Sequence, residues 1–122
     1  MIFLSTEDLL AVVSQQSLGV VRDVGLLDSA ALRPRATVFG EDAYPSVASK
    51  AAALLHSITR NHALIDGNKR LSWLATVTFL RLNAHDVEMS GDAAYELVID
   101  IGEGSVDDVE TIAERLRVKP LR

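Results

Sequence analysis

Apolar residues recur at spacings of three and four along most of this chain, which is the periodicity of α-helices that each bury one face. The clearest run is Val47, Ala51, Leu54, Leu55 and Ile58. Pro45 suits the first position of this predicted helix, and we expect the helix to end around Asn61. The pattern favours a bundle of helices and leaves little of the chain for strands.

A second long helix is predicted from about Asn68 to Asn83. Its apolar residues cover most of its circumference and are Leu71, Leu74, Ala75, Val77, Phe79, Leu80 and Leu82. A helix that is apolar all round but shorter than the roughly 18 apolar residues of a membrane span is buried in protein. We therefore expect this helix to be the central one of the bundle.

Shorter helices are predicted before this pair. Ser5 resembles an N-cap that opens a helix to about Gln16. Asp28 is the predicted cap of a second helix, which ends near Pro34. Residues 36–44 are predicted to be irregular or weakly extended.

The C-terminal part has the same helical rhythm. Residues 87–89 are predicted to be briefly extended, and Ser90 or Gly91 then opens a helix. The segment 105–108 resembles a capping box that starts the last helix, whose inner face is Val106, Val109, Ile112, Ala113 and Leu116. Residues 1–122 are thus predicted to form one all-α domain of about six helices with a short extended segment.

Composition excludes several classes of protein. The chain has no cysteine, so disulfides and thiolate chemistry are impossible. Its net charge of −5 argues against nucleic acid as the main partner. The start of the chain lacks the basic and apolar regions of a signal peptide, and no segment is long enough to span a membrane. We expect a cytoplasmic protein.

The junction of the two long helices has the opposite charge. Arg60, Lys69 and Arg70 are its cations, and Asp66 is its one carboxylate. Lys69 and Arg70 fall in the first turn of a helix, where the helix dipole disfavours cations. A bound polyanion resolves this conflict, because helix N–H groups and both cations can converge on phosphate oxygens. Gly67 permits a tight turn and close approach of a ligand to the backbone.

The junction also resembles a known signature. HALIDGNKR, residues 62–70, is similar to H-x-F-x-[DN]-[GA]-N-K-R of the Doc (death-on-curing) branch of the Fic/Doc family. Residues 25–30 and 51–56 resemble that branch too, so the resemblance covers most of the chain. It implies a Fic fold and a bacterial toxin that uses ATP and Mg²⁺.

The resemblance implies a role for each residue of the loop. His62 would be the general base that takes the proton from a protein hydroxyl. Asp66 would hold Mg²⁺ and would be catalytic with His62. The implied nucleotide- and phosphate-binding residues are Arg60, Gly67, Asn68, Lys69 and Arg70.

Lys69 indicates which reaction to expect. Family members with glycine at this position transfer AMP to proteins, whereas Doc-type members with lysine transfer the γ-phosphate of ATP. The resemblance therefore implies a protein kinase that phosphorylates elongation factor Tu and arrests translation. AMP transfer is the alternative.

Leu64 stands where the signature has phenylalanine. It would be an apolar anchor, and a loosened loop would leave a degenerate Fic-fold binding module. A metal phosphohydrolase using His56, His62 and His85-Asp86 is a further alternative.

Val38 and Phe39 resemble the flap that aligns the target segment in this family, with a cover for the edge of the core as the alternative. Residues 37–42 partly match an inhibitory motif, [ST]-x-x-x-E-[GN], but Asp42 departs from it and the segment is not helix-like. We therefore expect a separate, Phd-like antitoxin that binds through a helical segment. Trp73 is predicted to be a core residue and His56 a hydrogen-bonded one.

Overall fold

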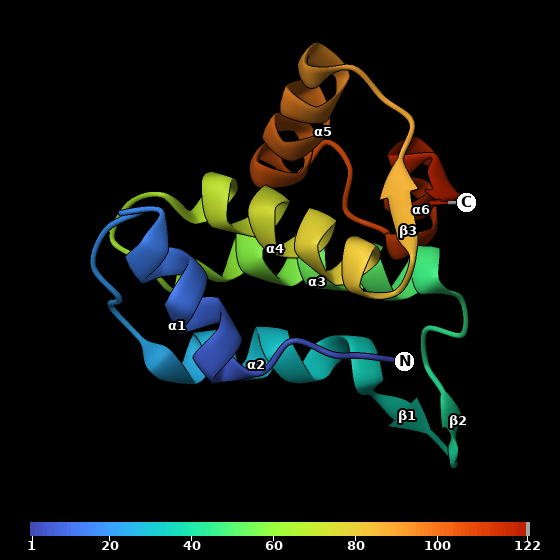
Figure 1. The fold of residues 1–122 in the computed structure, drawn as a ribbon, viewed down its shortest axis with the longest axis horizontal. Coiled ribbons are helices and arrows are strands. Elements are labelled where there is room, and N and C mark those ends of the chain that lie inside the picture. The colour runs from blue at the N-terminus through green and yellow to red at the C-terminus, as the bar shows by residue number, and fades with distance from the viewer. Residues whose placement is uncertain (122) are drawn as a thin grey trace.

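The computed structural model describes residues 1–121, and over these residues the chain forms six α-helices with short extended pieces (Figure 1). The helices are α1 (Thr6–Gln15), α2 (Val24–Leu32), α3 (Val47–Asn61), α4 (Asn68–Leu82), α5 (Gly91–Glu103) and α6 (Val109–Leu116). A single 3₁₀ turn, Arg33–Arg35, follows α2. The predicted all-α fold class is confirmed.

Helix α3 is the central helix of the bundle. Nine of its 15 residues are buried, and it contacts α2, α4, α5 and α6. The alanine run at 51–53 is fully buried, because small side chains let neighbouring helices approach closely. The prediction that α4 is central was wrong. Leu82 of α4 is exposed and Leu74 only half-buried, because the outer side of α4 has no helix packed over it.

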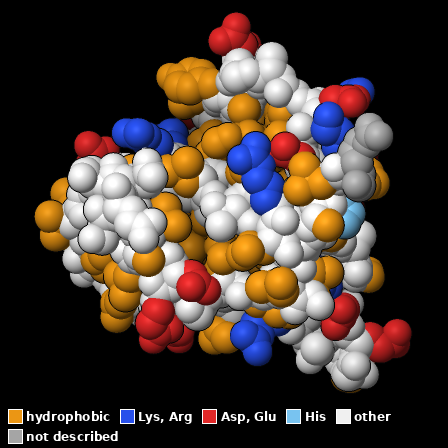
Figure 2. Space-filling view, in the orientation of Figure 1, with side chains coloured by type: hydrophobic (Ala, Val, Ile, Leu, Met, Phe, Trp, Pro, Cys, Tyr) orange, Lys and Arg blue, Asp and Glu red, His pale blue; other side chains and the backbone are white. Residues whose placement is uncertain are grey.

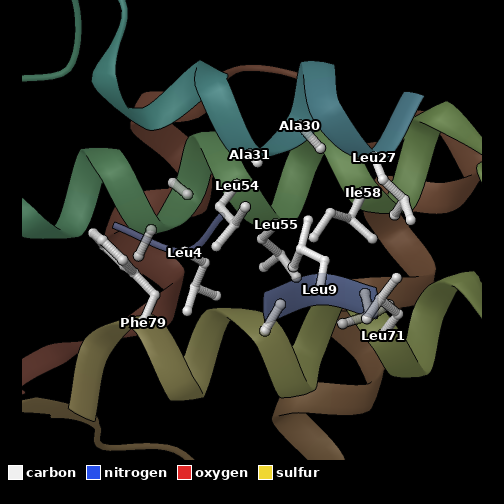
Figure 3. Close-up of a cluster of buried hydrophobic side chains, with 14 of the residues drawn as sticks. Leu4, Leu9, Leu27, Ala30, Ala31, Leu54, Leu55, Ile58, Leu71 and Phe79 are labelled. Carbon is white, nitrogen blue, oxygen red and sulfur yellow. The ribbon is translucent and has the colours of Figure 1, made fainter. Parts of the chain in front are cut away.

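The hydrophobic core lies around α3. In Figure 3, Leu54 and Ile58 of α3 lie between α2 on one side and α1 with α4 on the other. Leu27 of α2, Leu9 of α1 and Leu71 of α4 meet them there, and all five side chains are almost completely buried. These contacts hold the C-terminal half of α3 between the helices before and after it.

Three of the predicted helix starts were wrong by a few residues. Asp23, and not Asp28, caps α2: its side chain accepts a hydrogen bond from the Gly25 N–H. Asp28 lies inside α2 and accepts from the Thr6 hydroxyl at 2.7 Å, joining α2 to α1. Each error arose where several capping residues stand close together and tertiary packing selects one of them.

The other two errors have the same cause. Ser46 caps α3, so Pro45 precedes the helix instead of starting it. Asp108 caps α6, and its carboxylate accepts from the Thr111 N–H at 2.9 Å, so the segment from Ser105 belongs to the preceding loop. The capping box of α1, Ser5 with Asp8, was predicted correctly as a helix start.

The extended segment between α2 and α3 is a short hairpin. Strand β1 (Thr37–Val38) pairs antiparallel with β2 (Glu41–Asp42), and Phe39 and Gly40 form the turn with φ of 52° and 81°. The Lys50 ammonium is buried; it pairs with Asp42 at 3.0 Å and donates to the Tyr44 carbonyl. This contact attaches the hairpin to the N-terminal end of α3.

A second pair of strands closes the C-terminal part. Strand β3 (His85–Val87) pairs antiparallel with β4 (Val118–Pro120) and follows α4 directly. The predicted extended segment at 87–89 was therefore displaced by two residues, and β4 was not predicted, because the pairing needs a strand more than 30 residues away. Within residues 1–121, no helix combines the length and the hydropathy needed to cross a membrane.

Candidate functional site

A cleft of about 670 Å³ opens where α3 ends and α4 begins, with α5 as its opposite wall. His62, Asp66, Gly67, Asn68, Lys69 and Arg70 all line it. Figure 2 shows Lys or Arg side chains and apolar side chains together beside α5, in the orientation of Figure 1. The structure therefore brings the predicted residues of the 62–70 loop to one side of the molecule.

The loop that carries these residues is fixed by a short antiparallel ribbon. Val21 and Leu64 form an isolated β-bridge. Two backbone hydrogen bonds flank this bridge: the Ile65 N–H donates to the Val20 carbonyl at 3.0 Å, and the Arg22 N–H donates to the Ala63 carbonyl at 2.8 Å. Leu64 is only 1% exposed. Leucine thus occupies the predicted anchor position in the core, where the signature has phenylalanine.

The Asn68 side chain closes the loop on itself. Its Oδ1 accepts from the Leu64 N–H and its Nδ2 donates to the Leu64 carbonyl, both at 2.9 Å. The side chain is buried at this position. The Asn68 amide therefore holds the loop, and the residue also lines the cleft, where it stays a predicted phosphate-binding residue.

We expect Asn68→Ala to lower the free energy of unfolding by about 2–4 kcal/mol, because both polar groups of Leu64 would be buried without partners. Urea unfolding followed by circular dichroism measures this loss. Asn68→Asp should also be less stable than the native protein, because it keeps the acceptor for the Leu64 N–H but turns a second acceptor toward the Leu64 carbonyl. An alanine variant as stable as the native protein would contradict this account of the loop.

Gly67 occupies a position that only glycine fits. Its φ is +88°, and a Cβ built on it would lie 2.3 Å from the Leu18 carbonyl oxygen. The Gly67 N–H donates to Asp66 Oδ1 at 2.8 Å, which fixes the exposed carboxylate at the mouth of the cleft. Within residues 1–121, Asp66 forms no ion pair, so its charge faces the cleft unneutralised.

His62 ends α3 in an unusual backbone conformation. It is the C-cap of the helix, with φ 54° and ψ 48° in the left-handed region, and its side chain is exposed at the cleft. No hydrogen bond to its ring is present among the described residues. Both ring nitrogens are therefore open to a ligand. The Arg22 side chain contacts the His62 carbonyl, with Nε at 3.2 Å.

Lys69 and Arg70 begin α4 at its positive end. Neither forms an ion pair within the part of the chain that the structure describes. The stem of Lys69 lies against Gly102 of α5, where an added Cβ would be 3.1 Å from Lys69 Cε. The missing side chain at Gly102 thus leaves room for Lys69 between α4 and α5. Two unpaired cations at a helix N-terminus form an anion-binding arrangement.

Two of the predicted site elements lie elsewhere. The Arg60 guanidinium donates to the Ile101 carbonyl at 3.0 Å, at the end of α5, and does not line the cleft. Val38 and Phe39 lie in the hairpin at the opposite end of α3 from His62, and 15 helical residues separate these ends by about 22 Å (Figure 1). Phe39 is fully exposed, so it does not cover the edge of the core either.

The three histidines do not form a metal centre. His56 lies between Arg33, 2.6 Å from Nδ1, and Asp107, 2.8 Å from Nε2, as expected for a hydrogen-bonded histidine. The hydrogen bond from His56 lowers the pKa of the Asp107 carboxyl. His85 contacts the Asn83 carbonyl. Among residues 1–121, no three His, Asp or Glu side chains lie close enough to hold a metal ion, so the phosphohydrolase alternative has no site.

The apolar wall of the cleft was not predicted. Trp73, which we expected in the core, is half-buried and lines the cleft together with Tyr95 and Val98 of α5. Tyr95 is 69% exposed. The sequence offered no signal for this wall, because α5 faces the loop only after the chain has folded back at 83–90.

Comparisons with known proteins agree with this geometry. A sequence model described as the Fic/DOC family matches residues 3–80, a range that contains the whole 62–70 loop. The protein named Toxin Doc from Mycolicibacterium smegmatis (strain ATCC 700084 / mc(2)155) is 49% identical to the chain over 98 residues. This alignment covers 79% of the chain and 75% of the relative.

Proposed function

The chain belongs to the Fic/DOC family, and on that premise we propose that it is a Doc-type toxin of a toxin–antitoxin system that phosphorylates a protein. The observation that carries the proposal is the convergence of His62, Asp66 and Lys69 on one cleft. The proposed reaction transfers the γ-phosphate of ATP to a hydroxyl of a translation factor, elongation factor Tu. Arrested translation in the cytoplasm would follow.

His62 is the proposed general base. Its exposed ring would take the proton from the attacking hydroxyl of the target protein. The left-handed backbone of His62 ends α3, so the residue does not continue the helix. A positioned base of this kind contributes roughly 10²–10⁴ in rate. The ribbon with Val21 and the buried Leu64 would keep the base in place during transfer.

The residues present fit ATP with Mg²⁺. Mg²⁺ is usually held by one or two carboxylates together with phosphate oxygens, and Asp66 supplies one unpaired carboxylate at the cleft. When bound, Mg²⁺ would neutralise charge on the phosphates. Lys69, Arg70 and the first N–H groups of α4 would bind the remaining phosphate oxygens.

Transfer of the γ-phosphate is the reaction we expect from Lys69. Purified protein incubated with Mg²⁺ and elongation factor Tu should transfer label from γ-labelled ATP and none from α-labelled ATP, as measured by autoradiography and mass spectrometry of the target. Transfer of the α-label would identify an AMP-transferase instead. Absence of both labels, with nucleotide binding intact, would favour a binding module without turnover.

Inhibition is proposed to come from a separate antitoxin. Glu41, the only match to an inhibitory glutamate suggested by the sequence, lies in β2 at the far end of α3 and cannot reach the cleft. A helical segment of a Phd-like partner would bind along the apolar wall formed by Trp73, Tyr95 and Val98. Such a segment would cover the phosphate site beside it.

A further inference from the structure

Arg22 makes an unusual contact with the proposed base. Its Nε donates to the His62 carbonyl oxygen at 3.2 Å, and its Nη2 donates to the same oxygen. The two residues are 40 positions apart, so the contact joins the α1–α2 connection to the end of α3. Arg22 is exposed and forms no ion pair within residues 1–121. Its guanidinium hydrogen-bonds the His62 carbonyl instead.

The His62 carbonyl is a group that benefits from such a contact. It lies past the last turn of α3, where the helix dipole is negative and a cation is stabilising. The left-handed conformation of His62 costs a non-glycine residue on the order of 1–2 kcal/mol and persists only where neighbouring groups hold it. The N–H groups of Arg22 and Asp23 hold the next carbonyl, that of Ala63, and the Arg22 side chain is the group that holds the carbonyl of His62 itself.

We propose that Arg22 is a positioning residue for His62, one that holds the backbone of the base so that its imidazole faces the cleft. This inference rests on the proposed function. The backbone angles of residue 62 determine the direction of its Cα–Cβ bond, so losing the contact would let the ring swing while leaving the phosphate-binding residues in place. The loop itself would remain anchored through Leu64 and Asn68.

Steady-state kinetics of Arg22→Ala test this role. We expect kcat to fall about tenfold to a hundredfold, as for a reacting group misplaced by up to 1 Å, with KM for Mg-ATP within about twofold of the native value. Arg22→Lys keeps the cation but has a single donor group, so it should recover part of the loss. Arg81→Ala is the control, because Arg81 is an exposed cation at the other end of α4, paired with Asp86.

A second measurement does not depend on turnover. The ¹³C chemical shifts of the Cα and carbonyl of His62 report its backbone conformation, and they should move away from left-handed values in Arg22→Ala but not in Arg81→Ala. Unchanged shifts or unchanged kcat in Arg22→Ala would overturn the inference. A raised KM with native kcat would also overturn it, because Arg22 would then be a phosphate ligand. If the native protein transfers no label, the proposed function fails, and the shifts alone decide the role of Arg22.

Discussion

Replacing His62 with alanine is expected to reduce transfer of the γ-phosphate by roughly 10²–10⁴-fold with little change in stability. The His62 ring makes no hydrogen bond to the described part of the chain, so the fold does not depend on it. The phosphate-binding groups remain, so KM for Mg-ATP should change much less than kcat. Initial rates of label transfer and thermal unfolding measure the two expectations separately.

Two further variants make this test specific. His62→Asn keeps a residue that tolerates the left-handed conformation but removes the base, so it should be as inactive as the alanine variant. His85→Ala is the matched histidine control, because His85 contacts the Asn83 carbonyl and does not line the cleft. Native activity in His62→Asn would show that another group takes the proton.

Replacing Gly67 with alanine is expected to lower the free energy of unfolding by on the order of 3 kcal/mol and to lower activity by at least about 10²-fold. Two effects add at this position. The φ of +88° is unfavourable for alanine, and the new Cβ would lie 2.3 Å from the Leu18 carbonyl oxygen. Since the Cβ position is fixed by the backbone of residue 67 and the Leu18 oxygen is itself a backbone atom, the loop carrying Asp66 and the start of α4 must shift.

Gly40→Ala provides a matched control for the backbone effect. Gly40 has a similar φ of +81°, but nothing lies within 4 Å of an added Cβ in the hairpin turn. Its loss of stability should therefore be only about 1–2 kcal/mol. Urea unfolding of both variants isolates the cost of the contact with Leu18. Equal losses would mean that the Leu18 carbonyl moves away from the added methyl group at little cost in free energy.

The local signals in the sequence were sufficient for most of the fold. Helices α3 and α4 lie close to where their apolar periodicity places them, because residues three and four apart meet on one face whatever surrounds the helix, and α5 begins at the predicted Gly91. Caps were less certain, since the choice among Asp23, Asp28 and neighbouring residues depends on how α2 packs on α1. Which helix is central depends on what covers it, so hydropathy alone gave α4 instead of α3.

The candidate site divides in the same way. His62, Asp66, Gly67 and Lys69 were identified from the sequence because they belong to one continuous loop, in which spacing along the chain already determines proximity. The tertiary structure alone decided that Arg22 contacts the His62 carbonyl, that the Asn68 amide closes the loop, and that Arg60 binds the end of α5. The long Arg22 and Arg60 side chains can each reach many acceptors, and only the folded arrangement of the helices selects one. The Asn68 amide can hydrogen-bond several nearby backbone groups, and the folded loop selects those of Leu64.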